Sequence, residues 1–134
     1  RYGHHTGDEA LVRIAELITE HLQPTDIVGR IGGEEFAVLL KNQTIGEAWI
    51  VAESIRQSIY SEEFEADDGE HCQLSVSIGL NRVHRTDQQY PLRKVDLALY
   101  EAKSMGRNRT VKFEASMDVP SAERFGDITK IVGG

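Results

Sequence analysis

The residues best suited to chemistry form the run Gly32–Glu35, two glycines followed directly by Glu34 and Glu35. Glycines at a hairpin tip let the backbone approach a ligand closely, and Mg²⁺ prefers carboxylates combined with substrate phosphates. Adjacent strand residues point to opposite faces, so both acids can share a metal only if the turn distorts this alternation. We select Glu34 as the better ligand. On spacing alone, a tight turn with solvated glutamates is the favoured interpretation.

Three charged residues could assist such a site. Lys103 and Arg107 lie four apart at the end of an expected helix, so both could project on one side and hold a triphosphate. Taken alone, they are more simply explained as basic residues that complement the helix dipole. Asp8 falls in the first turn of another expected helix, where the dipole favours an acid. None of these patterns assigns a function by itself.

The surrounding pattern predicts three amphipathic helices and four strands. Thr6 and Glu9 have capping-box spacing, as do Thr44 and Glu47, and each pair precedes apolar residues at helical spacing. The expected order is a helix from Thr6 to Pro24, a hairpin of 26–31 and 35–40, a helix from Thr44, an acidic loop at 62–70, a strand at 74–80 with one buried face, a helix from Pro91 to Gly106, and a strand at 109–114. This order predicts an α+β or α/β fold, a sheet covered by helices, and it leaves one sheet position unfilled.

Size and charge limit the classes of function. The 134 residues suit one domain, and the net charge of -7 with a pI near 5.2 argues against binding of a nucleic acid polymer, which needs clustered cations. A single cysteine, Cys72, in an apolar run indicates a reducing compartment, so we expect a cytoplasmic protein. No apolar run is long enough to span a bilayer, so we expect no membrane contact by this domain.

Taken together, four blocks resemble the GGDEF-domain diguanylate cyclases over about residues 1–114. The blocks are Tyr2-Gly3-His4 with Gly7-Asp8, Arg30-Ile31-Gly32-Gly33-Glu34-Glu35-Phe36, Ser75-Val76-Ser77-Ile78-Gly79, and Asp96-Leu97-Ala98-Leu99-Tyr100-Glu101-Ala102-Lys103 with Gly106-Arg107-Asn108. The resemblance implies a mainly antiparallel central sheet flanked by helices, similar to the palm or ferredoxin-like core of nucleotidyl cyclases. A β-hairpin would carry Gly32–Phe36.

The resemblance also implies an activity: two GTP molecules are condensed to cyclic di-GMP with release of two pyrophosphates, as the output of a bacterial signalling protein. Catalysis would need Mg²⁺, or Mn²⁺ as an alternative, and a homodimer in which each domain holds one GTP. The implied roles are metal ligand and catalytic residue for Glu34, catalytic support for Glu35, and nucleotide binding for Asp8, Gly32, Gly33, Lys103 and Arg107. The domain would be cytoplasmic, on its own or as part of a larger membrane-anchored sensor.

Two departures from the family pattern matter. The family's first strand, with its metal-binding aspartate, would precede Arg1, so we expect residues 1–115 to be a GGDEF domain that is incomplete at its N-terminal end. Residues 116–134 are expected to be a tail or linker with a short helical turn near 121–125. Second, the family's inhibitory Arg-x-x-Asp site appears here as Gln23 to Asp26, so the arginine is missing and we expect weak or absent product inhibition.

An alternative from a different class stays open. A non-catalytic GGDEF domain would bind GTP or cyclic di-GMP as a sensor or scaffold. The intact pair Glu34 and Glu35 disfavours this alternative, because degenerate domains of the family commonly lose these acids.

Overall fold

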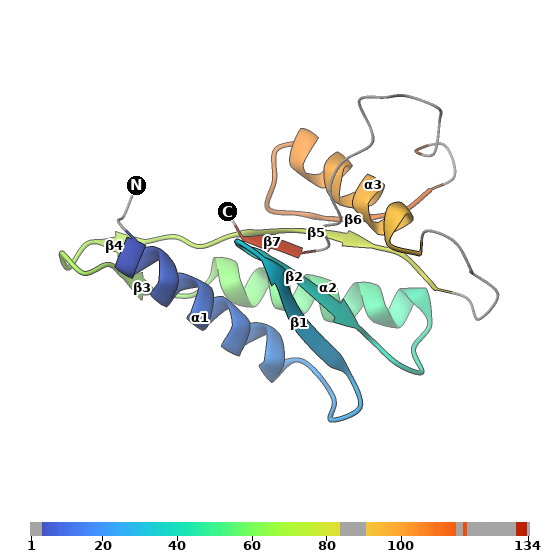
Figure 1. The fold of residues 1–134 in the computed structure, drawn as a ribbon, viewed down its shortest axis with the longest axis horizontal. Helices are drawn as coiled ribbons and strands as arrows, with labels where there is room; N and C mark the ends of the chain where they lie inside the picture. The colour runs from blue at the N-terminus through green and yellow to red at the C-terminus, as the bar shows by residue number, and fades with distance from the viewer. Residues whose placement is uncertain (1–3, 84–90, 115–116, 118–130, 134) are drawn as a thin grey trace.

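The computed structural model describes residues 4–83, 91–114, 117 and 131–133. Three helices surround a five-stranded sheet, and a separate two-stranded ribbon extends from one end (Figure 1). The elements are α1 (His4–Glu20), β1 (Ile27–Gly32), β2 (Glu35–Leu39), α2 (Ile45–Tyr60), β3 (Phe64–Glu65), β4 (His71–Cys72), β5 (Val76–Leu80), α3 (Pro91–Ser104), β6 (Thr110–Lys112) and β7 (Ile131–Gly133).

The sheet has the strand order β1-β2-β7-β5-β6. Three of its four pairings are antiparallel, and only β5 and β6 run parallel. The predicted α+β class with a mainly antiparallel sheet is therefore confirmed. The parallel pair follows from the connection, because α3 crosses over between β5 and β6 and returns the chain in the same direction.

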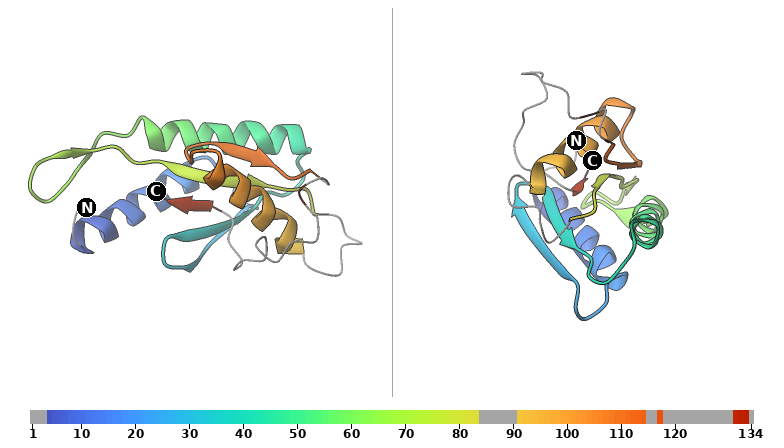
Figure 2. Two further views of the ribbon diagram at one scale, coloured as in Figure 1. Left: turned by 90° about the horizontal axis from the view of Figure 1, so that it is seen from above. Right: turned by 90° about the vertical axis from the view of Figure 1, so that its right-hand side faces the viewer.

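Helices cover both faces of the sheet. Val76 and Ile78 of β5 belong to the core that α1 and α2 form, and this core also contains Phe36 of β2. The alternate residues of β5, Ser77 and Gly79, are buried as well, on the face that α3 covers (Figure 2). Our expectation that only one face of this strand is buried was wrong: its small residues on the second face allow a helix to pack there.

Local signals explain the second helix. Thr44 accepts a hydrogen bond from the Glu47 N–H at 3.1 Å, and the Glu47 carboxylate accepts one from the Thr44 N–H at 2.8 Å. This is the predicted capping box, which satisfies two amides that a helix start would otherwise leave without partners. The apolar residues that follow Thr44 at helical spacing are the buried residues of α2: Ala48, Ala52, Ile55 and Ile59. The second capping-box prediction is thus confirmed.

The first capping-box prediction was wrong. Helix α1 already includes His4, so Thr6 lies inside the helix, and Asp8 lies in its second turn instead of its first. The apolar spacing that follows Thr6 was sound, since Ile14, Leu17 and Ile18 are buried against the sheet. The helix thus extends further toward the N-terminus than its capping signal indicated.

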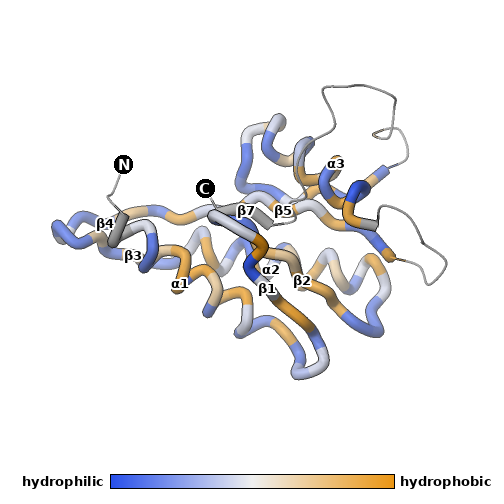
Figure 3. The backbone as a smooth tube through the Cα atoms, viewed as in Figure 1, coloured by the Kyte–Doolittle hydropathy of each residue, from blue (hydrophilic) through white to orange (hydrophobic). Residues whose placement is uncertain are grey.

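Two further segments differ from expectation. The acidic loop at 62–70 contains β3, which pairs with β4 as a short ribbon, and Figure 3 shows this end of the molecule as largely hydrophilic. Cys72 in β4 is buried and has no disulfide partner among the described residues. Residues 131–133, in the segment expected to be a tail, form β7 between β2 and β5. The helical turn expected near 121–125 lies outside the described residues.

Candidate active site

The hairpin turn at the end of β1 carries the central motif. The two strands are joined by Gly33 and Glu34, and Gly33 has a φ of 51°, as the first turn residue of a type II′ hairpin requires. Ile31 is an extra residue in β1, because Arg30 pairs with Phe36 while Gly32 pairs with Glu35. This bulge increases the twist of the hairpin just before its tip.

The turn also resolves the question of the two carboxylates. Glu34 lies in the turn and is exposed, whereas Glu35 is the first residue of β2 and is partly buried. Strand alternation therefore does not force the two side chains to opposite faces. Glu34 is therefore the acid that a ligand can reach more easily, and the partly buried Glu35 belongs to the sheet.

The glycines leave the backbone of the turn uncovered. A Cβ atom built on Gly32 or Gly33 would have no atom within 4 Å. The turn is fixed from one side by Arg30, whose Nε donates to the carbonyl oxygen of Gly33 at 2.7 Å. A ligand can thus reach the backbone N–H groups of an already ordered loop.

A second turn, Gly106–Arg109, connects α3 to β6. The Gly106 N–H donates to the Lys103 carbonyl at 3.3 Å, and the Arg107 N–H donates to the Ala102 carbonyl at 3.0 Å. These two bonds form a Schellman motif with Gly106 at the left-handed position, φ 115°, so the prediction that Gly106 ends the helix is confirmed.

The basic pair does not have the predicted helical geometry. Lys103 is in the last turn of α3 and is partly buried, but Arg107 lies beyond the helix with a φ of 64°. The i,i+4 argument for a shared side of the helix was therefore wrong. Arg107 is exposed, and its direction depends on the turn that carries it.

The sheet brings both turns to the same end of the molecule. Phe36 pairs with Ile131, which pairs with Ile78, which pairs with Thr110, so these residues form one row across four strands. The hairpin tip precedes Phe36 directly and the turn precedes Thr110 directly. In Figure 1 both loops accordingly lie at the same end of the sheet, near the C-terminal label. The distance between β2 and β6 is three strand spacings, or about 14 Å.

The other predicted nucleotide residue, Asp8, is exposed on α1. Figure 1 shows the N-terminal half of α1 directed toward the end of the molecule that carries the hairpin tip. Among the described residues, no hydrogen bond or ion pair joins Asp8 to either turn. Its contribution to guanine recognition therefore stays a prediction.

The donor set around Glu34 suits Mg²⁺ in combination with phosphates. In the part of the chain that the structure describes, no three His, Cys, Asp or Glu side chains gather as a metal site. Because Mg²⁺ is commonly held by one or two carboxylates together with substrate phosphates, Glu34 and its neighbour Glu35 are a suitable but partial protein contribution.

The segment from Gln23 to Asp26 has a structural role. One Asp26 oxygen accepts from the Gln23 N–H at 2.8 Å and the other accepts from the Lys41 N–H at 3.0 Å. The carboxylate thus closes the turn that leads into β1 and holds it to the chain after β2. These two bonds alone account for the acid at this position.

Fold and site together define an α+β domain with an uncovered glycine hairpin at one end of a mainly antiparallel sheet. The model of the family "Diguanylate cyclase, GGDEF domain" matches residues 1–109, and the chain belongs to this GGDEF family. Enzymes of this family are generally metal-dependent. Within residues 4–83 and 91–114, none of the helices has the length and hydropathy needed to cross a membrane.

Known proteins of the same family are similar over most of the chain. Diguanylate cyclase DosC of Escherichia coli is 35% identical over 117 residues, 87% of this chain and 25% of DosC. The active GGEEF domain of a diguanylate cyclase from Vibrio cholerae has a TM-score of 0.70 and 35% identity, over 84% of this chain and 71% of that one. The GGDEF domain of DgcB from Caulobacter crescentus, solved in complex with cyclic di-GMP, has a TM-score of 0.76 and 29% identity, over 82% and 66%. The chain spans about a quarter of the length of DosC.

Proposed function

We propose that this domain is the catalytic part of a diguanylate cyclase that condenses two GTP molecules to cyclic di-GMP. The observation that carries the proposal is the uncovered Gly32–Glu35 turn, with Glu34 exposed, at the same sheet end as Gly106–Arg109. A carboxylate on one side and cations on the other are what a metal-bound triphosphate needs. The similarity to the active GGEEF domain supports the same function.

Each residue has a role in the proposed reaction. The ribose 3′ oxygen of one GTP forms a bond to the α-phosphorus of the other, and the bond from that phosphorus to the bridging oxygen breaks, releasing pyrophosphate. Glu34 accepts the proton of the 3′ hydroxyl and Glu35 supports the turn. Lys103 and Arg107 offset the charge on the departing pyrophosphate, and Asp8 accepts hydrogen bonds from the guanine edge. The same step repeated closes the ring.

A metal ion completes the site in this proposal. Mg²⁺, with Mn²⁺ as an alternative, would be held by Glu34 and the phosphates and would supply charge neutralisation at the α-phosphate. One domain binds one GTP, so the two reacting groups come from two facing copies in a homodimer. We place the protein in the cytoplasm, where GTP is available.

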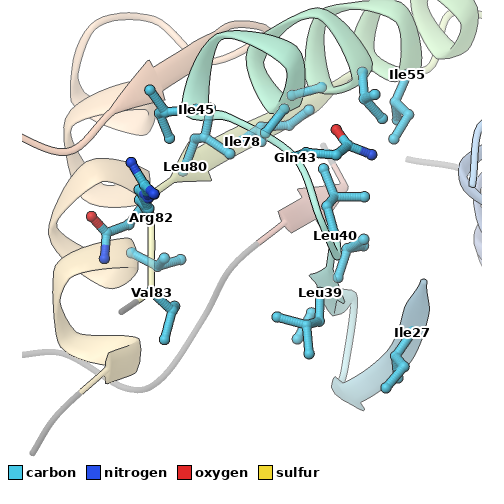
Figure 4. Close-up of a pocket in the computed structure, with 18 of the residues that line it drawn as sticks. Ile27, Leu39, Leu40, Gln43, Ile45, Ile55, Ile78, Leu80, Arg82 and Val83 are labelled. Carbon is cyan, nitrogen blue, oxygen red and sulfur yellow. The ribbon is translucent and has the colours of Figure 1, made fainter. Parts of the chain in front are cut away.

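The sheet itself supports the proposal that the domain gains another strand. Strand β7 pairs with β2 at Glu35 and Phe36. Among the described residues, no strand lies beside the inner edge of 37–39 or beside the facing edge of β5 beyond Ile78. Between these edges lies a cavity of about 640 Å³, whose walls come from the hairpin, β5 and α2 (Figure 4). Large apolar side chains along it remain exposed, among them Ile27, Leu39 and Val83.

An extended apolar segment would pair with both edges and cover these side chains. We infer that a strand preceding Arg1 occupies this whole row and takes over the place of β7, and that it carries the second acidic metal ligand. Hydrogen exchange on the protein extended upstream of Arg1 tests this: the amide of Gly79, which points away from β6, and those amides of 37–39 that point away from β1 should become protected. Unchanged exchange at these amides would refute the added strand.

The decisive experiment is product analysis. The upstream-extended protein is incubated with GTP and Mg²⁺, and cyclic di-GMP and pyrophosphate are quantified by mass spectrometry and a coupled assay. We expect product in wild type, a rate that rises with the square of protein concentration where the protein is mostly monomeric, and a loss of at least about a hundredfold in Glu34→Ala. Full turnover by Glu34→Ala would contradict the catalytic role proposed for Glu34. GTP binding without product would favour the sensor or scaffold function.

A further inference from the structure

The Gly106–Arg109 turn contains three consecutive residues with positive φ. The values are 115° for Gly106, 64° for Arg107 and 48° for Asn108. Glycine accepts this conformation readily and asparagine tolerates it, but an arginine there is strained. Such a backbone persists only when the surrounding structure holds it. The Schellman bonds hold the start of this turn, so the question is what holds Asn108.

A side chain from a different helix reaches that residue. Arg56 of α2 directs Nη1 toward Asn108, with distances of 3.3 Å to Oδ1 and 3.5 Å to the backbone oxygen. On the far side of the turn, Arg109 Nε donates to the Arg107 carbonyl at 3.1 Å, and the Arg109 carbonyl accepts from the Ile78 N–H at 2.9 Å. The strained pair is therefore held between α2 and β5.

Arg56 is itself fixed by Glu53, one turn earlier on α2. Nε donates to Oε2 at 2.8 Å and Nη2 donates to Oε1 at 2.9 Å, a two-point contact that fixes the plane of the guanidinium group. Both side chains are largely buried, with exposures of 17% for Arg56 and 24% for Glu53.

The two-point contact also keeps this pair charged. Hydrogen bonding to Arg56 lowers the pKa of Glu53, and hydrogen bonding to Glu53 raises the pKa of Arg56. With Nε and Nη2 bound to Glu53, the guanidinium group is held in an orientation that directs Nη1 toward Asn108.

We propose that Glu53 and Arg56 are positioning residues for the phosphate-binding turn. By holding Asn108 in its left-handed conformation, Arg56 sets the direction of the neighbouring Arg107 and keeps its cation at the sheet end that carries Glu34. This inference rests on the proposed function only in assigning a triphosphate to Arg107. It connects α2, which carries none of the predicted site residues, to substrate binding.

The test uses a substrate analogue that cannot react. In the upstream-extended protein, 3′-deoxy-GTP lacks the attacking hydroxyl, so its affinity is measured by titration calorimetry without turnover, and 3′-deoxyguanosine reports the base and sugar alone. We expect Arg56→Ala to weaken 3′-deoxy-GTP about tenfold or more, while 3′-deoxyguanosine changes less than about twofold. Arg56→Lys keeps the charge but loses the two-point fork, so its loss should be intermediate.

A double-mutant cycle shows whether Arg56 acts through Arg107. If it does, Arg56→Ala should add little to the loss already caused by Arg107→Ala. The matched control is Arg13→Ala, which breaks another partly buried ion pair, the one with Glu62, away from the turn. We expect this control to leave 3′-deoxy-GTP affinity unchanged.

Several results would overturn the inference. One is that Arg56→Ala and Arg56→Lys bind 3′-deoxy-GTP as tightly as wild type, and another is that Arg56→Ala weakens 3′-deoxyguanosine as much as 3′-deoxy-GTP. A third is that Arg56→Ala causes its full loss of affinity in the Arg107→Ala background as well. The last is that wild type does not bind 3′-deoxy-GTP. Should Arg56→Ala fail to fold, Arg56→Lys decides. A different result would show that the proposed function is wrong: wild type would bind 3′-deoxy-GTP but make no cyclic di-GMP from GTP.

Discussion

Helix α3 packs directly against the backbone of Gly79 in β5. A Cβ atom added there would lie 2.5 Å from the Val95 carbonyl oxygen and 2.5 Å from the Leu99 nitrogen, both backbone atoms of α3. Ordinary contacts between non-bonded heavy atoms lie at about 3.5–4.0 Å. Because backbone atoms cannot rotate away as a side chain can, Gly79→Ala must push α3 off the sheet by about 1 Å.

The stability cost follows from this displacement. Overpacking of a tight core costs about 1–3 kcal/mol, and we place Gly79→Ala at the upper end because the obstruction is backbone. Replacing a strand glycine recovers about 0.5–1 kcal/mol of chain entropy. The net loss is about 2 kcal/mol, which for a domain of this size lowers Tm by about 8 °C.

The same displacement should affect the site, because α3 carries Lys103 and ends at the Gly106–Arg109 turn. Urea unfolding and calorimetry give the stability, and 3′-deoxy-GTP affinity should fall together with it. The matched control is Gly29→Ala, since Gly29 has no positive φ and no atom within 4 Å of an added Cβ. An unfolding free energy for Gly79→Ala within about 0.5 kcal/mol of wild type would refute the packing argument.

Two further substitutions separate function from stability. The methyl group added in Gly32→Ala meets no atom within 4 Å, and Gly32 has no positive φ, so the unfolding free energy should stay within about 0.5 kcal/mol of wild type. GTP turnover should fall, because this methyl group covers the backbone that the phosphates approach. Undiminished turnover would contradict this role. Asp26→Ala removes the acceptor of the Gln23 and Lys41 amides and should cost about 1–3 kcal/mol in urea unfolding. Initial rates should be insensitive to micromolar cyclic di-GMP before and after this change, and inhibition that Asp26→Ala relieves would restore an inhibitory role to the acid.

Local sequence signals predicted those parts of the fold whose causes are local. The capping box at Thr44, the glycine turn at Gly33 and the helix stop at Gly106 each depend on residues within one turn of chain, and each is found in the structure. The parallel pairing of β5 and β6 and the position of β7 depend on contacts between distant segments, so no local pattern could specify them. The family resemblance supplied the fold class, which local patterns left between two options.

In the candidate site too, local features could be predicted from the sequence, whereas contacts between distant segments could not. Glu34 and Glu35 could be proposed from the sequence because the motif is contiguous, and the turn then explained how strand alternation is avoided. The helical geometry predicted for Lys103 and Arg107 was wrong because helical spacing was extended past the end of the helix. Arg56 was missed because its importance comes from Asn108, 52 residues away in the chain. Its only sequence signal was an acid and an arginine three apart on α2.

Separate contacts hold the two turns of the site in place, and these contacts limit how a triphosphate would bind. Arg30 fixes the hairpin turn, whereas Arg56 and the Schellman bonds fix the other, and the sheet holds them about 14 Å apart. Neither backbone can move to close that gap without breaking strand pairs. In the proposed reaction, the phosphates are therefore reached by the side chains of Lys103 and Arg107 from the α3 side of this gap and by a metal at Glu34 from the hairpin side. A site built this way tolerates little change in the direction of its cations, so the strained conformation of Arg107 is best understood as the means of aiming one of them.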